Sequence, residues 1–238
     1  MSNIAGIDLG TTYSGISILD QSGKPQIIKN DDGEYITPSV VGFPSAEKNK
    51  IWVGKFAKQL LISEPSRVVT RVKRDMGSDS KKYSIGDKEY SPEEISAQIL
   101  RKIIQDAEKT EGKISSVVIT VPAWFGENER QSTKEAGEEA GFTVDHIINE
   151  PTAAALYYAT KNPLAGKILV YDLGGGTFDA TIAEIKDNDV SCLASQGDGE
   201  LGGVDFDEVI LRILKKEYKN KYNKELVRED NTIGNENY

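Results

Sequence analysis

The feature that most constrains this chain is a glycine-dense turn between two strand-like segments within residues 170–185, which read VYDLGGGTFDATIAEI. Asp172 ends the first segment and Asp179 lies on the second. The turn between them consists of Gly174, Gly175, Gly176 and Thr177. Glycine accepts backbone angles closed to other residues and lets a ligand approach the main chain closely. The composition of this turn therefore predicts a ligand-binding hairpin.

The same arrangement occurs near the N-terminus, where residues 7–18 read IDLGTTYSGISI. Asp8 is the carboxylate that ends the first strand, and the turn consists of Gly10, Thr11, Thr12 and Tyr13. Successive backbone N–H groups in such turns bind anions, and the strand-ending aspartates can hold a hydrated Mg²⁺ nearby. Two ordinary glycine-rich hairpins are the alternative interpretation. Because the whole arrangement of strand, aspartate, glycine turn and second strand occurs twice, an internal duplication is favoured, in which the two turns clamp a polyphosphate from both sides.

Composition and charge exclude several classes of function. The net charge of −9 argues against a general nucleic-acid surface, because the phosphate backbone would be repelled. The single cysteine, Cys192, excludes an internal disulfide and a site of several thiolates, and its apolar strand context predicts a buried thiol. His146 stands alone and is expected on a strand or at the surface. Without a signal-like leader or a run long enough to span a bilayer, the chain is expected to be soluble and cytoplasmic, with no membrane partner.

The pattern of apolar residues predicts an α/β fold. Short strands are expected at 25–29 and 39–43, and a less regular block follows over residues 37–112, with a short helix near Val53. A capping box with proline in first position marks the start of a long helix at Ser91. Its expected buried stripe consists of Ile95, Ile99, Ile103 and Ala107, and it should end at Gly112.

A second group of elements surrounds Glu150. Residues 116–121 predict a strand covered on both faces, and a helix over 128–140 should end at Gly141. A strand over 147–149 then runs into an alanine-rich helix. Packing accounts for the alanines but not for Glu150 at the carboxyl end of the strand, where α/β sheets place ligand chemistry.

The second half of the chain repeats the beginning of the first half and then stops. A short break at 164–167 precedes the second hairpin, 190–196 should pair back onto 181–185, and a helix follows Gly203. Its apolar side contains Val209, Ile210, Ile213, Leu214 and Tyr218. The polar residues beyond Tyr222 predict a frayed end. We therefore expect a complete first lobe over residues 1–166, with 37–112 as an inserted outer subdomain, and an incomplete second lobe over 167–238.

The residues favour phosphoryl transfer over other chemistry. Neither turn leads directly into a helix, so P-loop and Rossmann interpretations fail. Asp8 and Asp172 could bind Mg²⁺ through water, while the hydroxyls of the two turns could bond phosphate oxygens. Either Glu150 or Asp179 could orient an attacking water. A cation is also needed at the γ-phosphate, and composition does not choose it among 29 lysines and arginines.

Five segments, in the same order along the chain, resemble the nucleotide-binding domain of the Hsp70 (DnaK-type) chaperones. They are IDLGTTYS at 7–14, VPAWF at 121–125, ERQSTK at 129–134, IINEPTAAA at 147–155 and DLGGGTFD at 172–179. The resemblance implies the actin-like ATPase fold, in which two RNase H-like lobes hold ATP or ADP in the cleft between them. In that family, ATP closes the lobes and opens a separate peptide-binding domain.

The resemblance also assigns roles to individual residues. Lys73, in the segment KRDMG at 73–77, would contact the γ-phosphate, and Glu150 would position the water. Asp8, Asp172 and Asp179 would serve Mg²⁺ and K⁺, and Pro122 and Arg130 would couple the lobes. The implied catalytic set is Lys73, Glu150, Asp172 and Thr177. Expected partners are ATP, a J-domain cochaperone and a nucleotide exchange factor; unfolded peptide would bind only through a C-terminal domain that this sequence lacks.

Departures from the family pattern leave other interpretations open. Asp75, Ser78 and Asp79 replace the usual arginines, Ala159 replaces a hinge glycine, and Val204 stands where glutamate is usual. The adenosine-binding glycines, second connecting segment and linker are absent, so phosphate contacts are expected without an adenine pocket. One alternative is a weak or inert lobe that acts as an interaction module or is only a fragment. Another is a sugar or acetate kinase of the actin-like superfamily, which would need a substrate-binding base in place of Glu150 and Pro151.

Overall fold

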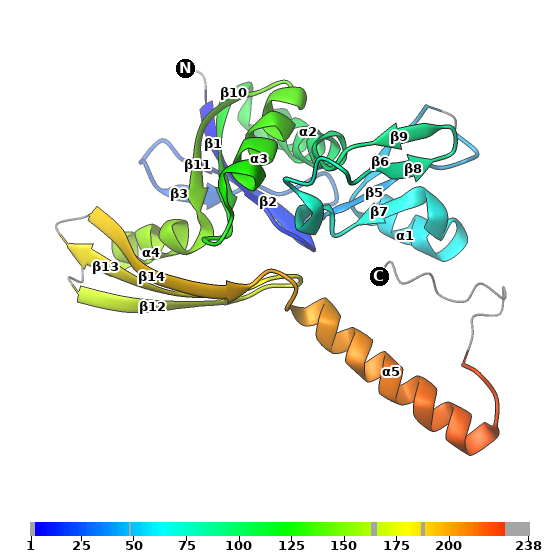
Figure 1. The fold of residues 1–238 in the computed structure, drawn as a ribbon. Helices are drawn as coiled ribbons and strands as arrows, with labels where there is room; N and C mark the ends of the chain where they lie inside the picture. The colour runs from blue at the N-terminus through cyan, green and yellow to red at the C-terminus, as the bar shows by residue number, and fades with distance from the viewer. Residues whose placement is uncertain (1–2, 48, 163–165, 187–188, 227–238) are drawn as a thin grey trace.

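The largest sheet of the chain is a mixed one that carries the first glycine turn (Figure 1). The computed structural model describes residues 3–47, 49–162, 166–186 and 189–226. The sheet contains β1 (Asn3–Leu9), β2 (Tyr13–Leu19), β3 (Pro25–Ile27), β4 (Thr37–Pro38), β10 (Ile114–Val121) and β11 (Thr143–Asn149). Its order is β11-β10-β1-β2-β3, with β4 beside β2. β1 pairs in parallel with β10 and antiparallel with β2, so the first hairpin joins a crossover strand as an α/β fold requires.

Two helices form the core with this sheet. α2 (Pro92–Glu111) begins at Ser91, whose side chain accepts a hydrogen bond from the N–H of Glu94 while the Glu94 carboxylate accepts one from the N–H of Ser91. The predicted stripe is confirmed, because its four residues are all buried in the main hydrophobic cluster. α3 (Glu127–Glu139) packs against α2 and against β10 and β11. The chain leaves α3 through Gly141, whose φ of 99° is the left-handed conformation expected after a helix C-terminus.

α4 (Glu150–Lys161) joins the two halves of the structure. It begins directly at the end of β11, with Pro151 in its first turn, and it contacts strands of both the first sheet and the second (Figure 1). Pro151 and Ala155 are buried in this position, whereas Ala153 is only partly buried and Ala154 is exposed, so the packing role predicted for the alanines is confirmed only at Ala155. Glu150 is thereby held at the point where the two sheets approach each other.

Before α2 in the chain, the irregular block predicted over residues 37–112 consists of small elements. A three-stranded sheet contains β5 (Val40–Gly42), β6 (Trp52–Val53) and β7 (Val68–Thr70), with α1 (Lys55–Ser63) packed against it. Two 3-10 turns, η1 (Pro65–Arg67) and η2 (Val72–Asp75), and a hairpin of β8 (Tyr83–Ile85) and β9 (Lys88–Tyr90) complete it. α1 ends before Pro65, as predicted.

The second glycine turn lies in a separate antiparallel sheet of β12 (Gly166–Leu173), β13 (Phe178–Lys186) and β14 (Asp189–Asp198). The pairing of 190–196 onto 181–185 is confirmed. Of the predicted break at 164–167, residues 164 and 165 lie outside the described residues, and Gly166 and Lys167 already belong to β12. The buried thiol predicted at Cys192 is wrong, because Cys192 is exposed. Cys192 lies on β14, of which only Val190 and Gly197 are even partly buried, so packing does not cover the side chains of this strand.

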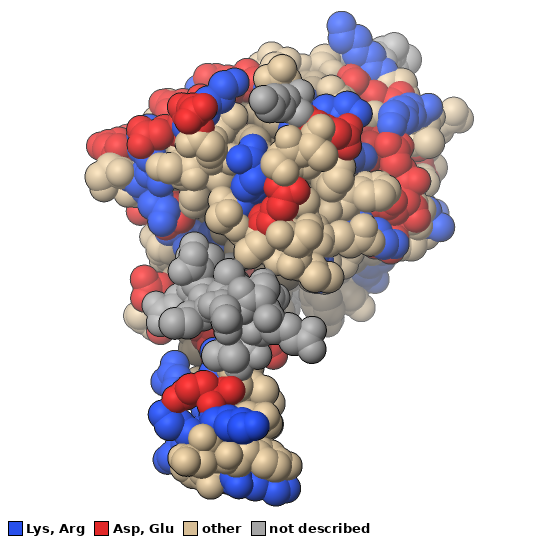
Figure 2. All heavy atoms as spheres, turned by 90° about the vertical axis from the view of Figure 1, so that its right-hand side faces the viewer, with Lys and Arg blue, Asp and Glu red and all other residues tan. Residues whose placement is uncertain are grey.

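The last described helix, α5 (Gly203–Tyr222), extends away from both sheets (Figure 1). None of its residues is buried, and the apolar side that contains Val209 and Ile213 is exposed. Basic side chains with acidic ones among them cover much of the lower projection in Figure 2, and both kinds are scattered over the rest of the visible face. The predicted frayed end lies mostly at residues 227–238, outside the described residues. Among the helices of the described residues, none has both the length and the apolar character needed to cross a membrane.

Candidate active site

The two glycine turns lie directly against each other. We call residues 10–12, between β1 and β2, the first loop, and residues 174–177, between β12 and β13, the second loop. A Cβ atom added to Gly175 would lie 1.9 Å from Thr12 Oγ1, and one added to Gly176 would lie 2.2 Å from Thr11 Cγ2. Neither glycine has a positive φ, so the prediction that special backbone angles require them is wrong. Glycine is needed in the second loop because the other loop, rather than an open cleft, occupies the space of a side chain.

The first loop presents two hydroxyls that have no partner. Thr11 Oγ1 and Thr12 Oγ1 are buried, and neither makes a hydrogen bond within the described residues. Ser39 holds the loop in place, since its hydroxyl donates to Gly10 O at 2.7 Å and its N–H donates to Thr12 O at 2.8 Å. Buried hydroxyls without partners cost free energy, so they indicate that a ligand supplies the missing hydrogen bonds.

Tyr13, which was also predicted to bind the nucleotide, begins β2 and is exposed. The ammonium group of Lys58 lies 5.6 Å from the centre of its ring and 3.4 Å from its hydroxyl. This arrangement places Tyr13 at the rim of the site rather than among the buried groups.

The carbonyl groups of the second loop are all engaged. Gly174 O and Gly175 O accept hydrogen bonds of 3.0 and 2.9 Å from the first N–H groups of α5, and Gly176 O accepts from Arg74. Among the hydrogen bonds between described residues, none is donated by the N–H groups of Gly175, Gly176 or Thr177. Consecutive free N–H groups of this kind are the donors that phosphate oxygens bind.

A buried ion pair joins Lys73 of η2 to Glu150, the first residue of α4. Their side chains are only 6% and 13% exposed, although the two residues are far apart in the sequence. Burial raises the pKa of Glu150; the positive charge of Lys73 opposes this rise, and the charges of Asp8 and Asp172 add to it. The structure therefore brings together the two residues that the sequence resemblance named for the γ-phosphate and the water.

Three aspartates, Asp8, Asp172 and Asp179, lie within electrostatic reach of this ion pair. Burial, and then the charge of Asp8, raises the pKa of Asp172, and burial, followed by the charge of Asp172, raises the pKa of Asp179. The positive charge of Lys73 opposes both of these rises, so Lys73 is within electrostatic reach of each aspartate. Asp179 Oδ1 is buried and has no hydrogen-bond partner within the described residues, while Asp8, at the end of β1, accepts a bond of 3.4 Å from Thr120.

This group of carboxylates fits a hydrated cation. Negative charges held close together gain stability when a positive ion lies between them. Within the described residues, no three histidine, cysteine or acidic side chains are placed to hold a metal directly. Mg²⁺ usually keeps several of its waters, and Asp8, Asp172 and Asp179 could bind it, or K⁺, through those waters.

Hydrogen bonds link Pro122 and Arg130 to Asn149, the residue before Glu150. Pro122 O accepts from the N–H of Phe125 at 3.2 Å, and Phe125 O accepts from Arg130 Nε at 3.0 Å. Arg130 Nη2 donates to Asn149 Oδ1 at 2.6 Å, one residue before Glu150. The contacts are continuous, and the coupling role of these residues stays a prediction.

Arg74 and Asp205 were not recognised from the sequence. Arg74 donates both to Gly176 O of the second loop and to the carboxylate of Asp205 at the start of α5. The only available signals were the position of Arg74 directly after Lys73 and that of Asp205 three residues after Gly202. Sequence spacing alone cannot show that these two segments meet.

Two departures from the family pattern have structural explanations. The N–H of Val204 donates to Gly175 O, a backbone contact that does not depend on its side chain. Asp75 accepts a hydrogen bond from the hydroxyl of Tyr83 and lies 3.7 Å from Lys81 Nζ. Burial and this contact raise the pKa of Tyr83. Asp75 therefore anchors the β8–β9 hairpin beside η2.

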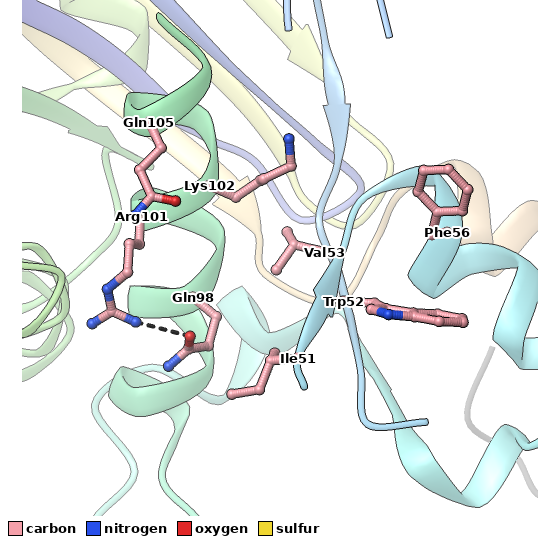
Figure 3. A pocket seen from close by; sticks show the side chains of 8 residues that line it. All are labelled: Ile51, Trp52, Val53, Phe56, Gln98, Arg101, Lys102 and Gln105. Carbon is pink, nitrogen blue, oxygen red and sulfur yellow. Dashed lines mark hydrogen bonds between the residues drawn. The ribbon is translucent and has the colours of Figure 1, made fainter. Parts of the chain in front are cut away.

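A separate cavity of about 410 Å³ lies between α2 and β6 (Figure 3). Ile51 and Val53 point toward α2, which contributes Gln98 and Lys102 (Figure 3). Its lining includes none of the residues predicted for phosphate or metal binding. We therefore assign the candidate active site to the two loops and the Lys73–Glu150 pair.

Comparison with protein families supports the resemblance found in the five motifs. The family model described as Hsp70 protein matches residues 4–85 and 80–235 of this chain. Proteins of that family have the actin-like ATPase fold, and the ATPase domain that they share drives chaperone function. The mixed α/β architecture, with five α-helices in the described residues, agrees with this fold. The chain belongs to the Hsp70 family.

Proposed function

We propose that this chain binds Mg–ATP through the two loops and hydrolyses the bond between the β- and γ-phosphates. It would do so as the ATPase domain of an Hsp70-type chaperone that acts in protein folding and the stress response. The observation that supports this most strongly is the buried Lys73–Glu150 pair, which faces carboxylates with raised pKa values. A buried lysine, a buried glutamate and free loop hydroxyls are the groups that phosphoryl transfer to water needs.

Each residue has a distinct task in this proposal. Thr11, Thr12 and the free N–H groups of the second loop donate to phosphate oxygens, and Lys73 neutralises the charge that develops on the γ-phosphate. As Lys73 turns toward the phosphate, a Glu150 oxygen becomes free to accept a hydrogen bond from the attacking water. Asp179 remains the other candidate for orienting that water, since its buried Oδ1 lacks a partner within the described residues. Mg²⁺, when bound, supplies further positive charge to the phosphates.

We also propose the division into lobes that the sequence suggested. Residues 1–166 form the first lobe, with 37–112 inserted as an outer subdomain, and residues 167–238 form part of the second. The two loops come from different sheets, and Lys73 reaches the site from the inserted block, which supports this division. J-domain and exchange-factor partners and a cytoplasmic location follow from the family and belong to the same proposal.

A second candidate function is an interaction module with little catalytic activity. The exposed apolar side of α5, together with exposed Leu169 and Tyr171 on β12, favours it, because exposed apolar patches often mark contact surfaces. This candidate predicts that the chain binds a J-domain or exchange-factor partner while hydrolysing ATP no faster than the background rate.

The proposed ATPase function is tested by single-turnover phosphate release from Mg–ATP. We expect Lys73→Ala and Glu150→Ala each to reduce the rate by about 100-fold or more, since positioned acid–base and charge-stabilising groups contribute on that order. The matched control is the exposed pair Lys134 and Glu138 on α3, whose alanine variants should keep the parent rate. Unchanged rates in both site variants would remove these assignments, and an inactive parent chain would favour the interaction module.

A further inference from the structure

Arg74 connects the segment that carries Lys73 to the second loop. Its Nε and Nη2 donate to Gly176 O at 3.0 and 2.7 Å, and its Nη1 and Nη2 donate to the Asp205 carboxylate at 3.2 and 2.6 Å. The guanidinium therefore makes a two-pronged contact with a carboxylate while it also holds a backbone carbonyl. Such bidentate pairs fix orientation as well as supplying energy.

Asp205 extends this contact to the other side of the second loop. Its Oδ2 accepts a hydrogen bond of 2.7 Å from the N–H of Gly202, at the start of α5. Burial raises the pKa of Asp205, but the hydrogen bonds from Arg74 and from the Gly202 N–H outweigh it and hold the pKa below the usual value. There is no room for a side chain at Gly202, since a Cβ atom there would lie 2.4 Å from the N–H nitrogen of Gly176. The start of α5 is therefore pressed against the loop that Arg74 holds.

The position of Arg74 in the chain couples it to Lys73. Both residues belong to the four-residue turn η2, which the hydrogen bonds from Arg74 N to Arg71 O and from Met76 N to Lys73 O close. A shift of Arg74 must therefore shift the backbone of Lys73. Lysine could not replace Arg74, because an ammonium group lacks the planar fork that serves Asp205 and Gly176 O together.

We propose that Arg74 is a positioning residue that fixes the distance between Lys73 and the second loop, and so places the γ-phosphate cation relative to the phosphate-binding N–H groups. This inference rests on the ATPase function proposed above. Arg74 acts through Lys73 and Gly176. Arg74 therefore contributes to the rate of hydrolysis at saturating ATP. It also holds the second loop in place when no nucleotide is bound.

The structure provides a matched control in a neighbouring ion pair. Arg71 is the residue directly before η2. It donates a hydrogen bond of 2.8 Å to Glu208 Oε1 of α5, and so also links this segment to α5. It makes no contact with the second loop among the described hydrogen bonds. Loss of the Arg71 pair removes one link between the same two elements and leaves the loop contact intact.

The experiment compares Arg74→Gln, Arg74→Lys and Arg71→Gln with the parent chain, using two measurements. The first is single-turnover ATP hydrolysis at saturating Mg–ATP, with the fraction of folded protein checked by circular dichroism. A displacement of about 1 Å costs roughly 100-fold in rate, so we expect a loss of that order for Arg74→Gln, a smaller loss for Arg74→Lys and none for Arg71→Gln. A merely structural ion pair would lower the thermal midpoint equally in the Arg71 and Arg74 variants, without lowering the rate per folded molecule.

The second measurement is hydrogen–deuterium exchange of residues 172–179 in the nucleotide-free chain. We expect faster exchange in Arg74→Gln and parent-like exchange in Arg71→Gln. If the parent chain is active and Arg74→Gln keeps both its rate of hydrolysis and its rate of exchange, the role of Arg74 is refuted and the ATPase proposal stands. An inactive parent would refute the ATPase proposal, and the exchange of the second loop alone would then decide whether Arg74 holds it.

Discussion

Replacement of Gly175 by alanine should separate the two loops. The added methyl group would lie 1.9 Å from Thr12 Oγ1 and 2.7 Å from Thr12 Cβ. The first distance must open to the 3.4 Å at which ordinary contact begins, an increase of about 1.5 Å. A displacement of this size costs about 100-fold in a positioned reaction, and overpacking of a close contact costs about 1–3 kcal/mol of stability.

Gly15→Ala is the matched control for this substitution. A Cβ atom at Gly15 would meet Tyr35 O at 3.7 Å, which is ordinary contact, and Gly15 also has no positive φ. Single-turnover phosphate release and thermal unfolding should both show large losses for Gly175→Ala and small ones for Gly15→Ala. The reasoning fails if Gly175→Ala hydrolyses ATP at the parent rate and unfolds at the parent temperature, because the loops would then not be in contact.

Two further predictions concern stability. Because burial and the charge of Asp8 raise the pKa of Asp172 in the folded chain, its ionised form destabilises the fold as pH rises through that pKa. Asp172→Asn should therefore raise the melting temperature at pH 7 without Mg²⁺, and this gain should disappear as pH falls to about 4, the usual aspartate range; a constant gain across this range would refute the electrostatic cause. Ile99→Ala, at a fully buried position of α2, should cost about 2–5 kcal/mol in denaturant unfolding, whereas Ile213→Ala, 56% exposed on α5, should change stability by about 0.5 kcal/mol or less. Similar losses in the two variants would show that α5 is packed.

Local patterns in the sequence predicted much of the fold. The capping box at Ser91, the stripe that begins at Ile95 and the glycine after α3 depend only on neighbouring residues, and all three are confirmed. Cys192 shows the limit of this reasoning. An apolar strand pattern does not reveal whether another element covers the faces of the strand, and most residues of β14 are exposed.

The candidate site could be predicted only in part for a similar reason. The motifs identified both loops and, through the family resemblance, Lys73 and Glu150. The arrangement of Arg74, Gly176 and Asp205 depends on how η2, the second loop and α5 meet, which no spacing in the sequence encodes. Of the two reasons that the sequence offered for the second-loop glycines, unusual backbone angles are wrong for Gly175 and Gly176. Close approach to the main chain does exclude side chains there, although the first loop makes that approach in this structure.

The most direct test of the proposed site is calorimetric titration of the chain with ATP, with Mg²⁺ and with EDTA. We expect one ATP to bind per chain, and binding to weaken strongly in EDTA because the carboxylates Asp8, Asp172 and Asp179 then repel the phosphates. Glu150→Ala should retain Mg-dependent binding while losing hydrolysis, because Glu150 is assigned to the water rather than to the nucleotide. An absence of binding heat in the parent chain, or binding that does not depend on Mg²⁺, would contradict the proposed phosphate clamp.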